Sequence, residues 1–396
     1  MRGRTCLSEG VRGGTITVYY RNESGPYRML PDNQTLAHPD HPALAAAPGR
    51  LVRLLADDLT GACDAGAAFL KAGYSVRVWL GPTALFPAPE PAQAFHTASR
   101  SLPAEEAANA VSRAAASLQS GPGTVLFKKV DSAGRGPLAA EVLAAQQALG
   151  TRAILLAPAF PAAGRTVCNG MLQIRDECGQ DRLVDLREFF AADMREAIAV
   201  VSESSGIEAA IEGGARVLIC DSATQDDLCA LARAAESLQG VLYAGSAGLA
   251  QAIAGLHPVP AQPLPTAAAA RTLVVAGSEH PVTARQLAVL EQAVQMRNDV
   301  QMLRIACQSG DDAMVRAVFG ALEPEALILT GGDTAQLAAE ALGAHSIRLC
   351  GEFAPGIPWG RLQGGAAEGR IVVTKSGGFG SPTALYDVIM KLSGVL

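Results

Sequence analysis

The chain has 396 residues, 49% of them hydrophobic and 18% charged, and a formal net charge of −6. This composition allows a sizeable core and argues against global disorder, and the lack of a basic block argues against a nucleic-acid partner. No apolar run approaches the roughly 20 residues that span a membrane, no signal peptide is recognisable, and the eight cysteines lack C-x-x-C spacing. We therefore expect a cytoplasmic protein of two or three domains, with reduced thiols and no zinc site.

Residues 1–49 differ from the rest of the chain, because they are rich in proline and show little periodicity. Residues 15–20 could form a short strand, but no nearby segment is an obvious pairing partner. We expect a poorly ordered extension here and assign no chemistry to it.

From residue 50 to residue 254, apolar strands alternate with helices. The predicted strands are 51–56, 76–80, 124–130, 153–157, 217–220 and 241–244, and the predicted helices are 62–72, 104–118, 138–149 and 226–238. Such alternation predicts right-handed βαβ units and a mostly parallel sheet. Residues 255–270 interrupt it with four prolines and a run of alanines, which is typical of a linker. The sequence thus predicts a domain boundary there.

Residues 271–396 repeat one pattern three times: an apolar strand, a loop of Gly, Ser and Thr, and a helix. The strands are 272–276, 326–329 and 370–373, and the loops that follow contain Gly277-Ser278, Thr330-Gly331-Gly332-Asp333 and Thr374-Lys375-Ser376-Gly377. Glycine lets backbone N–H groups approach an anion, and a helix N-terminus adds a partial positive charge. Three such loops at one end of a parallel sheet indicate a phosphate-rich ligand. The sequence as a whole predicts two α/β domains, each a mostly parallel sheet flanked by helices, with the active site in the cleft between them.

Asp57 and Asp58 directly follow the strand predicted at 51–56, and a helix of small residues follows them. In an open α/β sheet, ligands bind beyond the carboxyl ends of the strands. There the pair could orient a substrate hydroxyl, accept its proton or hold Mg²⁺. Alternatively, Asp58 only caps the helix through its side-chain oxygen. Because side chains alternate along a strand, the two carboxylates point to different faces, and the sequence does not decide which one is the base.

A second group of charged residues stands at the end of the strand predicted at 124–130. Lys128 and Lys129 point to opposite faces of that strand, so at most one of them reaches the crevice. The simpler interpretation is an ion pair between a lysine and Asp131, which is worth little when exposed. Arg165 lies in a proline-rich loop, where its guanidinium could bind a carboxylate through two hydrogen bonds or remain solvated.

Several known site types are absent or disfavoured. The chain contains neither the P-loop pattern G-x-x-x-x-G-K-[ST] nor a G-x-G-x-x-G after a strand. Ser246 lies in Ala244-Gly-Ser-Ala-Gly248, which lacks the first glycine of the G-x-S-x-G nucleophile elbow, and no histidine is an obvious base for it. A serine hydrolase is therefore disfavoured, and Ser246 is interpreted as a small residue in a tight turn.

Six motifs, in this order, resemble the four-carbon acid sugar kinase family. They are Ala56-Asp-Asp-Leu-Thr-Gly-Ala, Lys129-Val-Asp-Ser-Ala-Gly-Arg-Gly, Pro158-Ala-Phe-Pro-Ala-Ala-Gly-Arg-Thr, Gly331-Gly-Asp-Thr, Pro355-Gly-Ile-Pro-Trp and Lys375-Ser-Gly-Gly-Phe-Gly. The resemblance implies an acid-sugar-binding domain at 50–254, a linker at 255–270 and a nucleotide-binding domain at 271–396. It also implies ATP-dependent phosphorylation of threonate, erythronate or 3-oxo-tetronate, with ATP and Mg²⁺ as cofactors.

The resemblance further implies roles for the residues in these motifs. Catalysis would depend on Asp57 and Asp58. The sugar acid would contact Lys129, Asp131, Ser132, Arg135, Gly164 and Arg165. The nucleotide would contact Ser278, Gly331, Gly332, Asp333, Gly351, Glu352, Phe353, Ala354, Lys375 and Gly377. The metal ligands stay unassigned, and the identity of the sugar acid stays open.

In the expected mechanism, the C-terminal domain holds the phosphates of ATP and the N-terminal domain holds the sugar acid, with its carboxylate on Arg165 or Arg135. One carboxylate of the Asp57–Asp58 pair orients the attacking hydroxyl and accepts its proton, magnesium bridges the phosphates, and the linker lets the domains close. The main alternative is a non-catalytic sensor of the same fold, which binds the acid without turning over ATP. The expected partners are a small-molecule sugar acid and ATP, with no nucleic acid and no membrane, and a homo-oligomer stays open.

Overall fold

The computed structural model describes residues 50–81, 88–118, 120–175, 180–261, 263–295 and 297–395, together with the backbone of residues 6–12, 15–21 and 28–29. Met1–Ala47 and Pro48–Leu396 are two separate compact units.

Three strands of the first unit form an antiparallel sheet: β1 (Cys6–Arg12), β2 (Thr15–Arg21) and β3 (Arg28–Met29). β2 covers the strand predicted at 15–20 and pairs with β1 along its whole length. The expectation that this strand lacks a partner is therefore wrong. The physical reason lies in the sequence between the two strands, Gly13-Gly14, a dipeptide that two-residue hairpin loops favour. The other residues of 1–49 lie outside the described part, so the predicted poor order of this extension stays a prediction.

The second unit is built on one 14-stranded sheet in the order β12-β13-β8-β14-β7-β4-β6-β5-β18-β19-β20-β17-β15-β16. Its N-terminal half contains the strands β4 (Val52–Ala56), β5 (Val76–Trp79), β6 (Ala92–His96), β7 (Val125–Lys129), β8 (Ala153–Ala157), β12 (Ile198–Val201), β13 (Val217–Cys220) and β14 (Val241–Gly245). All of these strands pair in parallel. Strands such as β4 and β8 are buried along their whole length, as expected for continuous apolar runs in a parallel sheet.

Helices cover both faces of this half. They are α1 (Leu59–Lys71), α2 (Ala104–Ala116), α3 (Leu138–Leu149), α4 (Ile207–Glu212), α5 (Gln225–Glu236) and α6 (Ala247–Leu256). The crossovers through α2 and α3 run along the sheet in one direction, and those through α1 and α5 run in the other. Because βαβ crossovers are right-handed, the two pairs lie on opposite faces. In agreement, α2 contacts α3, while α1, α6 and α5 pack in series.

The C-terminal half contains the parallel strands β15 (Thr272–Ala276), β16 (Val300–Arg304), β17 (Ala326–Thr330) and β20 (Ile371–Lys375) and the antiparallel hairpin of β18 (Ser346–Ala354) and β19 (Ile357–Gln363). Its helices are α7 (Pro281–Val294), α8 (Asp311–Leu322), α9 (Gly332–Ala341) and α10 (Ala384–Leu392). β20 extends past the strand predicted at 370–373, because Thr374 and Lys375 are buried strand residues rather than loop residues.

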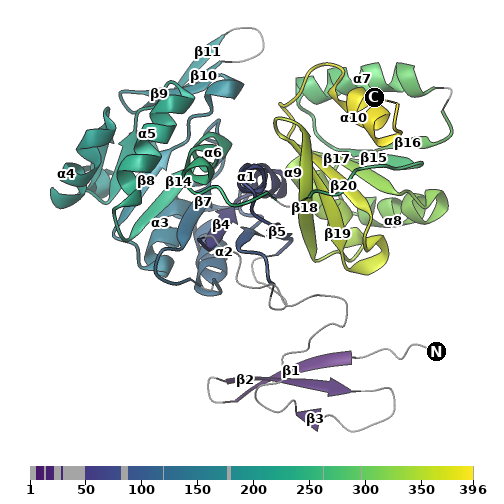
Figure 1. Ribbon diagram of the computed structural model, residues 1–396, viewed down its shortest axis with the longest axis horizontal. Helices are drawn as coiled ribbons and strands as arrows, with labels where there is room; N and C mark the ends of the chain where they lie inside the picture. The colour runs from purple at the N-terminus through teal and green to yellow at the C-terminus, as the bar shows by residue number, and fades with distance from the viewer. Residues whose placement is uncertain are drawn as a thin grey trace. The chain divides into compact units, whose positions relative to one another are not determined.

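The two halves share the sheet because β18 pairs antiparallel with β5. A buried ion pair supports this junction: the Arg77 guanidinium lies 2.8 Å from Glu90 and also donates to the Ser346 hydroxyl. Figure 1 shows the halves on either side of α1 and the β5–β18 pair. The predicted fold class, α/β with mostly parallel strands and flanking helices, is confirmed. The domain boundary at 255–270 stays a prediction.

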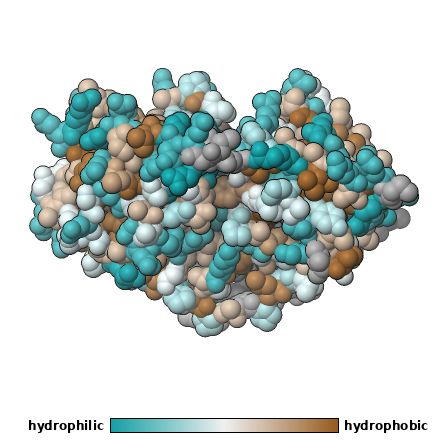
Figure 2. Space-filling model, turned by 90° about the horizontal axis from the view of Figure 1, so that it is seen from above, coloured by the Kyte–Doolittle hydropathy of each residue, from teal (hydrophilic) through white to brown (hydrophobic). Residues whose placement is uncertain are grey.

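A small antiparallel sheet, which was not predicted from the sequence, stands beside the N-terminal half (Figure 1). It consists of β9 (Arg165–Cys168), β10 (Met171–Arg175) and β11 (Asp181–Asp185) in the order β11-β10-β9. On the face drawn in Figure 2, hydrophobic residues are scattered among hydrophilic ones rather than gathered in one patch. Within the described part of the chain, no helix has the length and apolar character to cross a membrane.

Candidate active site

A cleft of about 1500 Å³ opens between the two halves of Pro48–Leu396. Its N-terminal wall consists mainly of residues at or after the carboxyl ends of β4, β7, β8 and β14, which are neighbours in the sheet. Its C-terminal wall consists of residues that follow β15, β17 and β20, which are also neighbours. The three Gly/Ser/Thr loops therefore lie at one end of a parallel sheet, as the sequence predicts, and they face the N-terminal half.

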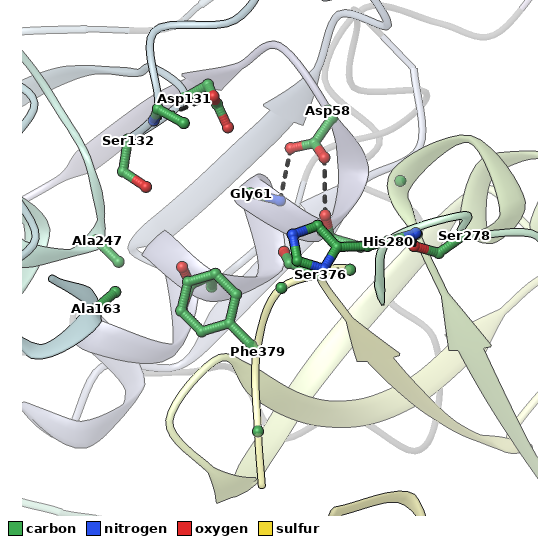
Figure 3. Close-up of a pocket in the computed structure, with 18 of the residues that line it drawn as sticks. Asp58, Gly61, Asp131, Ser132, Ala163, Ala247, Ser278, His280, Ser376 and Phe379 are labelled. Carbon is green, nitrogen blue, oxygen red and sulfur yellow. Dashed lines mark hydrogen bonds between the residues drawn. The ribbon is translucent and has the colours of Figure 1, made fainter. Parts of the chain in front are cut away.

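Asp58 lies at the N-terminal wall and is the N-cap of α1. Its carboxylate accepts hydrogen bonds from the Gly61 amide (2.8 Å) and the Thr60 hydroxyl (2.7 Å), which Figure 3 shows as dashed lines. The same carboxylate is bound by both terminal nitrogens of Arg100, at 2.6 and 2.8 Å. Asp58 therefore caps α1, as one of the two interpretations predicted, and its carboxylate also belongs to an ion pair in the cleft.

Asp57 does not line the cleft. Its Oδ2 accepts from Arg100 Nε at 2.7 Å, and its buried Oδ1 has no hydrogen-bond partner among the described residues. Burial alone would raise the pKa of Asp57, but Arg100 and the two lysines of β7 outweigh burial and hold the pKa below its ordinary value. Arg100, which the sequence analysis missed, thus connects the two carboxylates even though they leave the strand in different directions.

Asp131 and Arg135 form a second ion pair in the cleft. Arg135 contacts both oxygens of Asp131, at 2.7 and 2.9 Å, and Arg100 lies 3.8 Å away. Although burial by itself raises it, the pKa of Asp131 is held well below its usual range by these two arginines. The predicted ion pair between a lysine and Asp131 is not observed. The cations next to the Asp131 carboxylate are Arg135 and Arg100.

Lys128 and Lys129 point to opposite faces of β7, as predicted. Lys128 is fully buried and pairs with Glu141 of α3 at 2.7 Å. Lys129 lines the cleft, and its ammonium donates to the Val130 carbonyl at 2.8 Å. Only Lys129 can therefore contact a ligand.

The loop after β8 contributes Gly164 and Arg165, and both line the cleft. Gly164 has φ 72°, a left-handed conformation that glycine adopts without strain. This conformation ends a short 3₁₀ turn (Pro161–Ala163) and directs the chain into β9. Arg165 donates to the Ala163 carbonyl through Nη1, while its buried Nε has no hydrogen-bond partner among the described residues. Ser132 also lines the cleft (Figure 3).

Ser278, Gly331, Gly332, Asp333 and Gly377 all line the opposite wall. The loops are tightly packed: a Cβ on Gly377 would lie 2.6 Å from the Ser278 hydroxyl, and a Cβ on Gly332 would lie 2.5 Å from Asp58 Oδ2. Gly331, with φ 97°, is the N-cap of α9. The first residue of α9 therefore contacts the carboxylate that caps α1, so the two walls meet at this point.

Lys375 was expected to contact the nucleotide, but it does not line the cleft. Its fully buried ammonium donates to the carbonyls of Ser376 and Gly377 and to the Thr283 hydroxyl, each at 3.0 Å. Burial lowers the pKa of Lys375 to about 7. The side chain thus supports the glycine loop from beneath, because Lys375 belongs to β20 and points inward.

The segment Gly351–Ala354 divides in the same way. Phe353 and Ala354 line the cleft, whereas Gly351 packs against Trp359 and Glu352 pairs with Lys71. Alternation along β18 explains the partition only in part, because two register shifts interrupt the strand.

Ser246 is the N-cap of α6, and its buried hydroxyl donates to the Ala159 carbonyl. No histidine contacts this hydroxyl in the described part of the chain. The interpretation of Ser246 as a turn residue is in agreement with these contacts.

Further residues of the cleft escaped the sequence analysis. Asp64 of α1 lines it, and an aromatic pair, Phe160 and Phe379, comes from opposite walls with ring centroids 5.8 Å apart. His280, the N-cap of α7, lies beside Ser278 (Figure 3). Phe160 and Phe379 lie inside the motifs that carry the resemblance, so their positions were available as a signal.

Comparisons with known proteins agree with this architecture. A family model described as a sugar-binding N-terminal domain matches residues 52–189 and 182–253, and one described as a nucleotide-binding C-terminal domain matches residues 311–385. A D-threonate kinase of Bordetella bronchiseptica is 30% identical, over 85% of this chain and 96% of its own. A D-threonate kinase of Salmonella typhimurium is 29% identical (85% and 97%), and a D-erythronate kinase of Heliobacterium modesticaldum is 25% identical (84% and 95%).

Two solved structures share the fold. A Salmonella typhimurium protein described as a putative tRNA synthase has a TM-score of 0.68 at 19% identity and covers 85% of this chain and 98% of its own. Haemophilus influenzae protein HI1011 has a TM-score of 0.61 at 20% identity, with coverage of 86% and 100%. At these identities the likeness bears on the fold alone.

The fold and the matched models define a protein with a sugar-binding half and a nucleotide-binding half around one cleft. The chain belongs to the four-carbon acid sugar kinase family.

Proposed function

We propose that the protein transfers the γ-phosphoryl group of ATP to a hydroxyl of a four-carbon sugar acid such as threonate, erythronate or 3-oxo-tetronate. One observation carries the proposal: the carboxylate of Asp58 on the sugar-binding wall touches Gly332 on the nucleotide-binding wall. Phosphoryl transfer depends mainly on positioning and charge neutralisation, and a site where the two walls meet supplies both.

On the nucleotide side, ATP phosphates would lie over Gly331, Gly332 and Gly377. Glycine has no side chain of its own that would keep a phosphate from the backbone, and the N-terminus of α9 at Gly332 adds a partial positive charge. Lys375 supports the loop from beneath through its hydrogen bonds to the Ser376 and Gly377 carbonyls.

On the acid side, Arg165 and Arg135 are the cations that could receive the substrate carboxylate. The Nε of Arg165 is buried without a partner, and a buried donor without a partner gains most from a ligand that accepts from it. Arg135 is already bound to Asp131, although its guanidinium is largely exposed. Arg165 is therefore the better candidate for the carboxylate, and Lys129, Asp131, Ser132 and Gly164 would line the rest of the pocket.

Arg100, held in place by Asp58, would orient the attacking hydroxyl at the point where the walls meet. Phe160 and Phe379, whose rings contact each other across the cleft at an interplanar angle of 35°, would limit access of water to the reacting groups. The predicted closure through the linker at 255–270 belongs to the same proposal.

Mg²⁺ is the metal that this chemistry implies. In the described part of the chain, no group of three or more His, Cys, Asp or Glu side chains is placed to hold a metal. Mg²⁺ that enters with a nucleotide needs only one or two carboxylates besides phosphate oxygens and water. Asp333, exposed in the first turn of α9 and lining the cleft, fits that requirement and would hold the ion or its water shell. When bound, the ion neutralises charge on the phosphates.

A coupled ADP-release assay over D-threonate, D-erythronate and 3-oxo-tetronate, each with ATP and Mg²⁺, tests the proposal. We expect ADP release that depends on one of these acids and is absent without acid. If the protein binds an acid in calorimetry but releases no ADP with any of them, the proposal is wrong and the sensor alternative is right.

A further inference from the structure

Asp64 is a carboxylate of the cleft to which no role has been assigned. It lies on α1, three residues after Gly61 and four after Thr60, a spacing that brings these residues to one face of a helix. All three line the cleft, and Asp64 is 8% exposed. The face of α1 that carries Asp64 therefore borders the space between the sugar-binding and nucleotide-binding walls.

The Asp64 carboxylate has no hydrogen bond and no ion pair with any described residue. The other carboxylates of this region are occupied: Asp57 and Asp58 by Arg100, and Asp131 by Arg135 and Arg100. Buried polar groups in folded proteins are normally hydrogen-bonded, and the exceptions call for an explanation such as a ligand. A nearly buried, unpartnered carboxylate at the wall of the cleft indicates that a substrate group binds there.

The charges around Asp64 favour a proton acceptor. Burial raises the pKa of Asp64 to about 7, Lys129 of β7 and Lys71 of α1 lower it, and Glu352 of β18 and Asp58 raise it. A general base is most effective when its pKa lies near the working pH. Asp57 and Asp131 have pKa values below their ordinary range, so they accept protons poorly.

The candidate proton acceptors also differ in whether a substrate hydroxyl can reach a free oxygen of the carboxylate. Asp57 does not line the cleft, so a substrate hydroxyl cannot reach it. Both oxygens of Asp58 already accept two hydrogen bonds each, from Gly61 and Arg100 on one and from Thr60 and Arg100 on the other. A carboxylate offers about four lone-pair sites, so Asp58 has none left for a hydroxyl proton while Arg100 stays in place.

We propose that Asp64, rather than Asp57 or Asp58, accepts the proton of the attacking hydroxyl. This inference rests on the proposed kinase function. The substrate O–H bond breaks as its oxygen bonds to the γ-phosphorus, the bond from that phosphorus to the β,γ-bridging oxygen breaks, and ADP leaves. The proton resides on the Asp64 carboxylate and is released to water when the products leave. Asp58 then holds Arg100 in place, and Arg100 positions the hydroxyl through its oxygen without taking its proton.

The test compares pH–rate profiles of the wild type, Asp64→Asn and Asp64→Glu with the acid that the ADP-release assay identifies. The wild-type kcat/KM should rise with pH through about 7, because the base must be deprotonated. Asp64→Asn should lose this rise and about 10²- to 10⁴-fold in kcat, with the acid KM little changed. Asp64→Glu keeps a carboxylate and should restore part of the rate together with the rise.

Cys63→Ala provides a matched control, because Cys63 is the buried neighbour on α1 and does not line the cleft. Cys63→Ala should retain the wild-type pH–rate profile. A changed profile in Asp64→Asn then reflects proton transfer rather than altered packing of α1. The inference is overturned if Asp64→Asn keeps the wild-type rate and profile, or if Asp58→Asn alone abolishes the rise. A wild-type profile that is flat around pH 7 overturns it without any variant. A wild type that turns over none of the acids instead contradicts the proposed function itself.

Discussion

At the scale of single residues, Arg100 decides how the acidic side of the cleft is built. It binds Asp57 and Asp58 directly and lies 3.8 Å from Asp131. The sequence predicted the three carboxylates but not the arginine. Arg100 stands 42 residues from Asp58 in a loop without a recognisable pattern, and only the pairing of β4 with β6 brings it close. Contacts of this kind depend on tertiary structure and leave no local signal.

Replacing Arg100 should destabilise the protein in a pH-dependent way. Arg100→Met leaves buried carboxylates unpaired, and breaking a buried pair typically costs about 3–5 kcal/mol. Arg100 is one of the groups that hold the pKa of Asp57 and Asp131 below their unfolded values. Its contribution is therefore present above about pH 4 and is lost as the pH falls and the carboxylates become protonated. Urea unfolding at pH 7 and at acidic pH measures the difference.

A suitable control for that experiment is Arg316→Met. Arg316 pairs with Asp312 on the surface of α8, with both side chains about half exposed. Exposed pairs contribute little, so the urea midpoint should change little at either pH. Equal losses for the two variants, or a loss for Arg100→Met that does not depend on pH, would show that the carboxylate cluster does not need Arg100.

Lys375 shows a second limit of prediction from sequence, which concerns the direction of a side chain. Its position beside a glycine loop suggested a phosphate contact, but it is a buried strand residue that donates to the loop carbonyls. The predicted strand ends at residue 373, two residues before the observed end of β20, so the prediction places Lys375 in the loop although its side chain follows the alternation of the strand. Motif position alone therefore could not distinguish a ligand contact from a supporting residue.

At the scale of elements, the strand–loop–helix units were predictable because each is encoded locally. The strands that end at Lys129 or shortly before Asp58, Gly331 and Gly377 were all predicted within two residues of their observed ends. The β18–β19 hairpin and the small β9–β11 sheet were not predicted. Both carry a turn signal that the sequence analysis did not use: Asn169-Gly170 lies between β9 and β10, and Pro355-Gly356 lies between β18 and β19. The β5–β18 pairing joins residues 269 apart in sequence, as the Arg77–Ser346 contact illustrates.

The contact between the two walls at Gly332 allows a test of the glycine loop. A Cβ at this position would lie 2.5 Å from Asp58 Oδ2, so Gly332→Ala must displace either the start of α9 or the carboxylate. We expect ATP affinity measured by calorimetry to fall about tenfold or more, equivalent to about 1.4 kcal/mol. Unchanged affinity would mean that the loop serves the fold and not the phosphates.

Gly320→Ala is the matched control within the same half. Gly320 lies inside α8, and a Cβ there would meet nothing within 4 Å. Alanine in a helix interior is favoured over glycine by about 1 kcal/mol, so this variant should be slightly more stable and bind ATP as the wild type does.

At the scale of the whole molecule, two halves share one sheet, and the described residues that line the cleft all lie between Asp58 and Lys391. The fold class and the position of the cleft followed from the βα rhythm and the rule that ligands bind at the carboxyl ends of strands. That the two halves form one continuous sheet could not be predicted, since local sequence does not encode which edges of two sheets pair.

Deleting residues 1–47 should leave kcat and KM unchanged within experimental error. These residues form a separate unit, none of the described residues that line the cleft belongs to them, and the sugar-binding model begins at residue 52. Steady-state kinetics of the full chain and the shortened chain provide the measurement. A large loss of turnover in a shortened protein with an intact circular dichroism spectrum would assign the N-terminal unit a part in the reaction.

The claim that the cleft transfers a phosphoryl group from ATP to a four-carbon sugar acid is tested most directly by counting both products of one reaction. Phosphorylated acid is quantified by mass spectrometry and ADP by chromatography after incubation with ATP, Mg²⁺ and each acid. The account predicts equal amounts of phosphorylated acid and ADP for at least one of the acids. ADP without phosphorylated acid, or acid binding without either product, would contradict it.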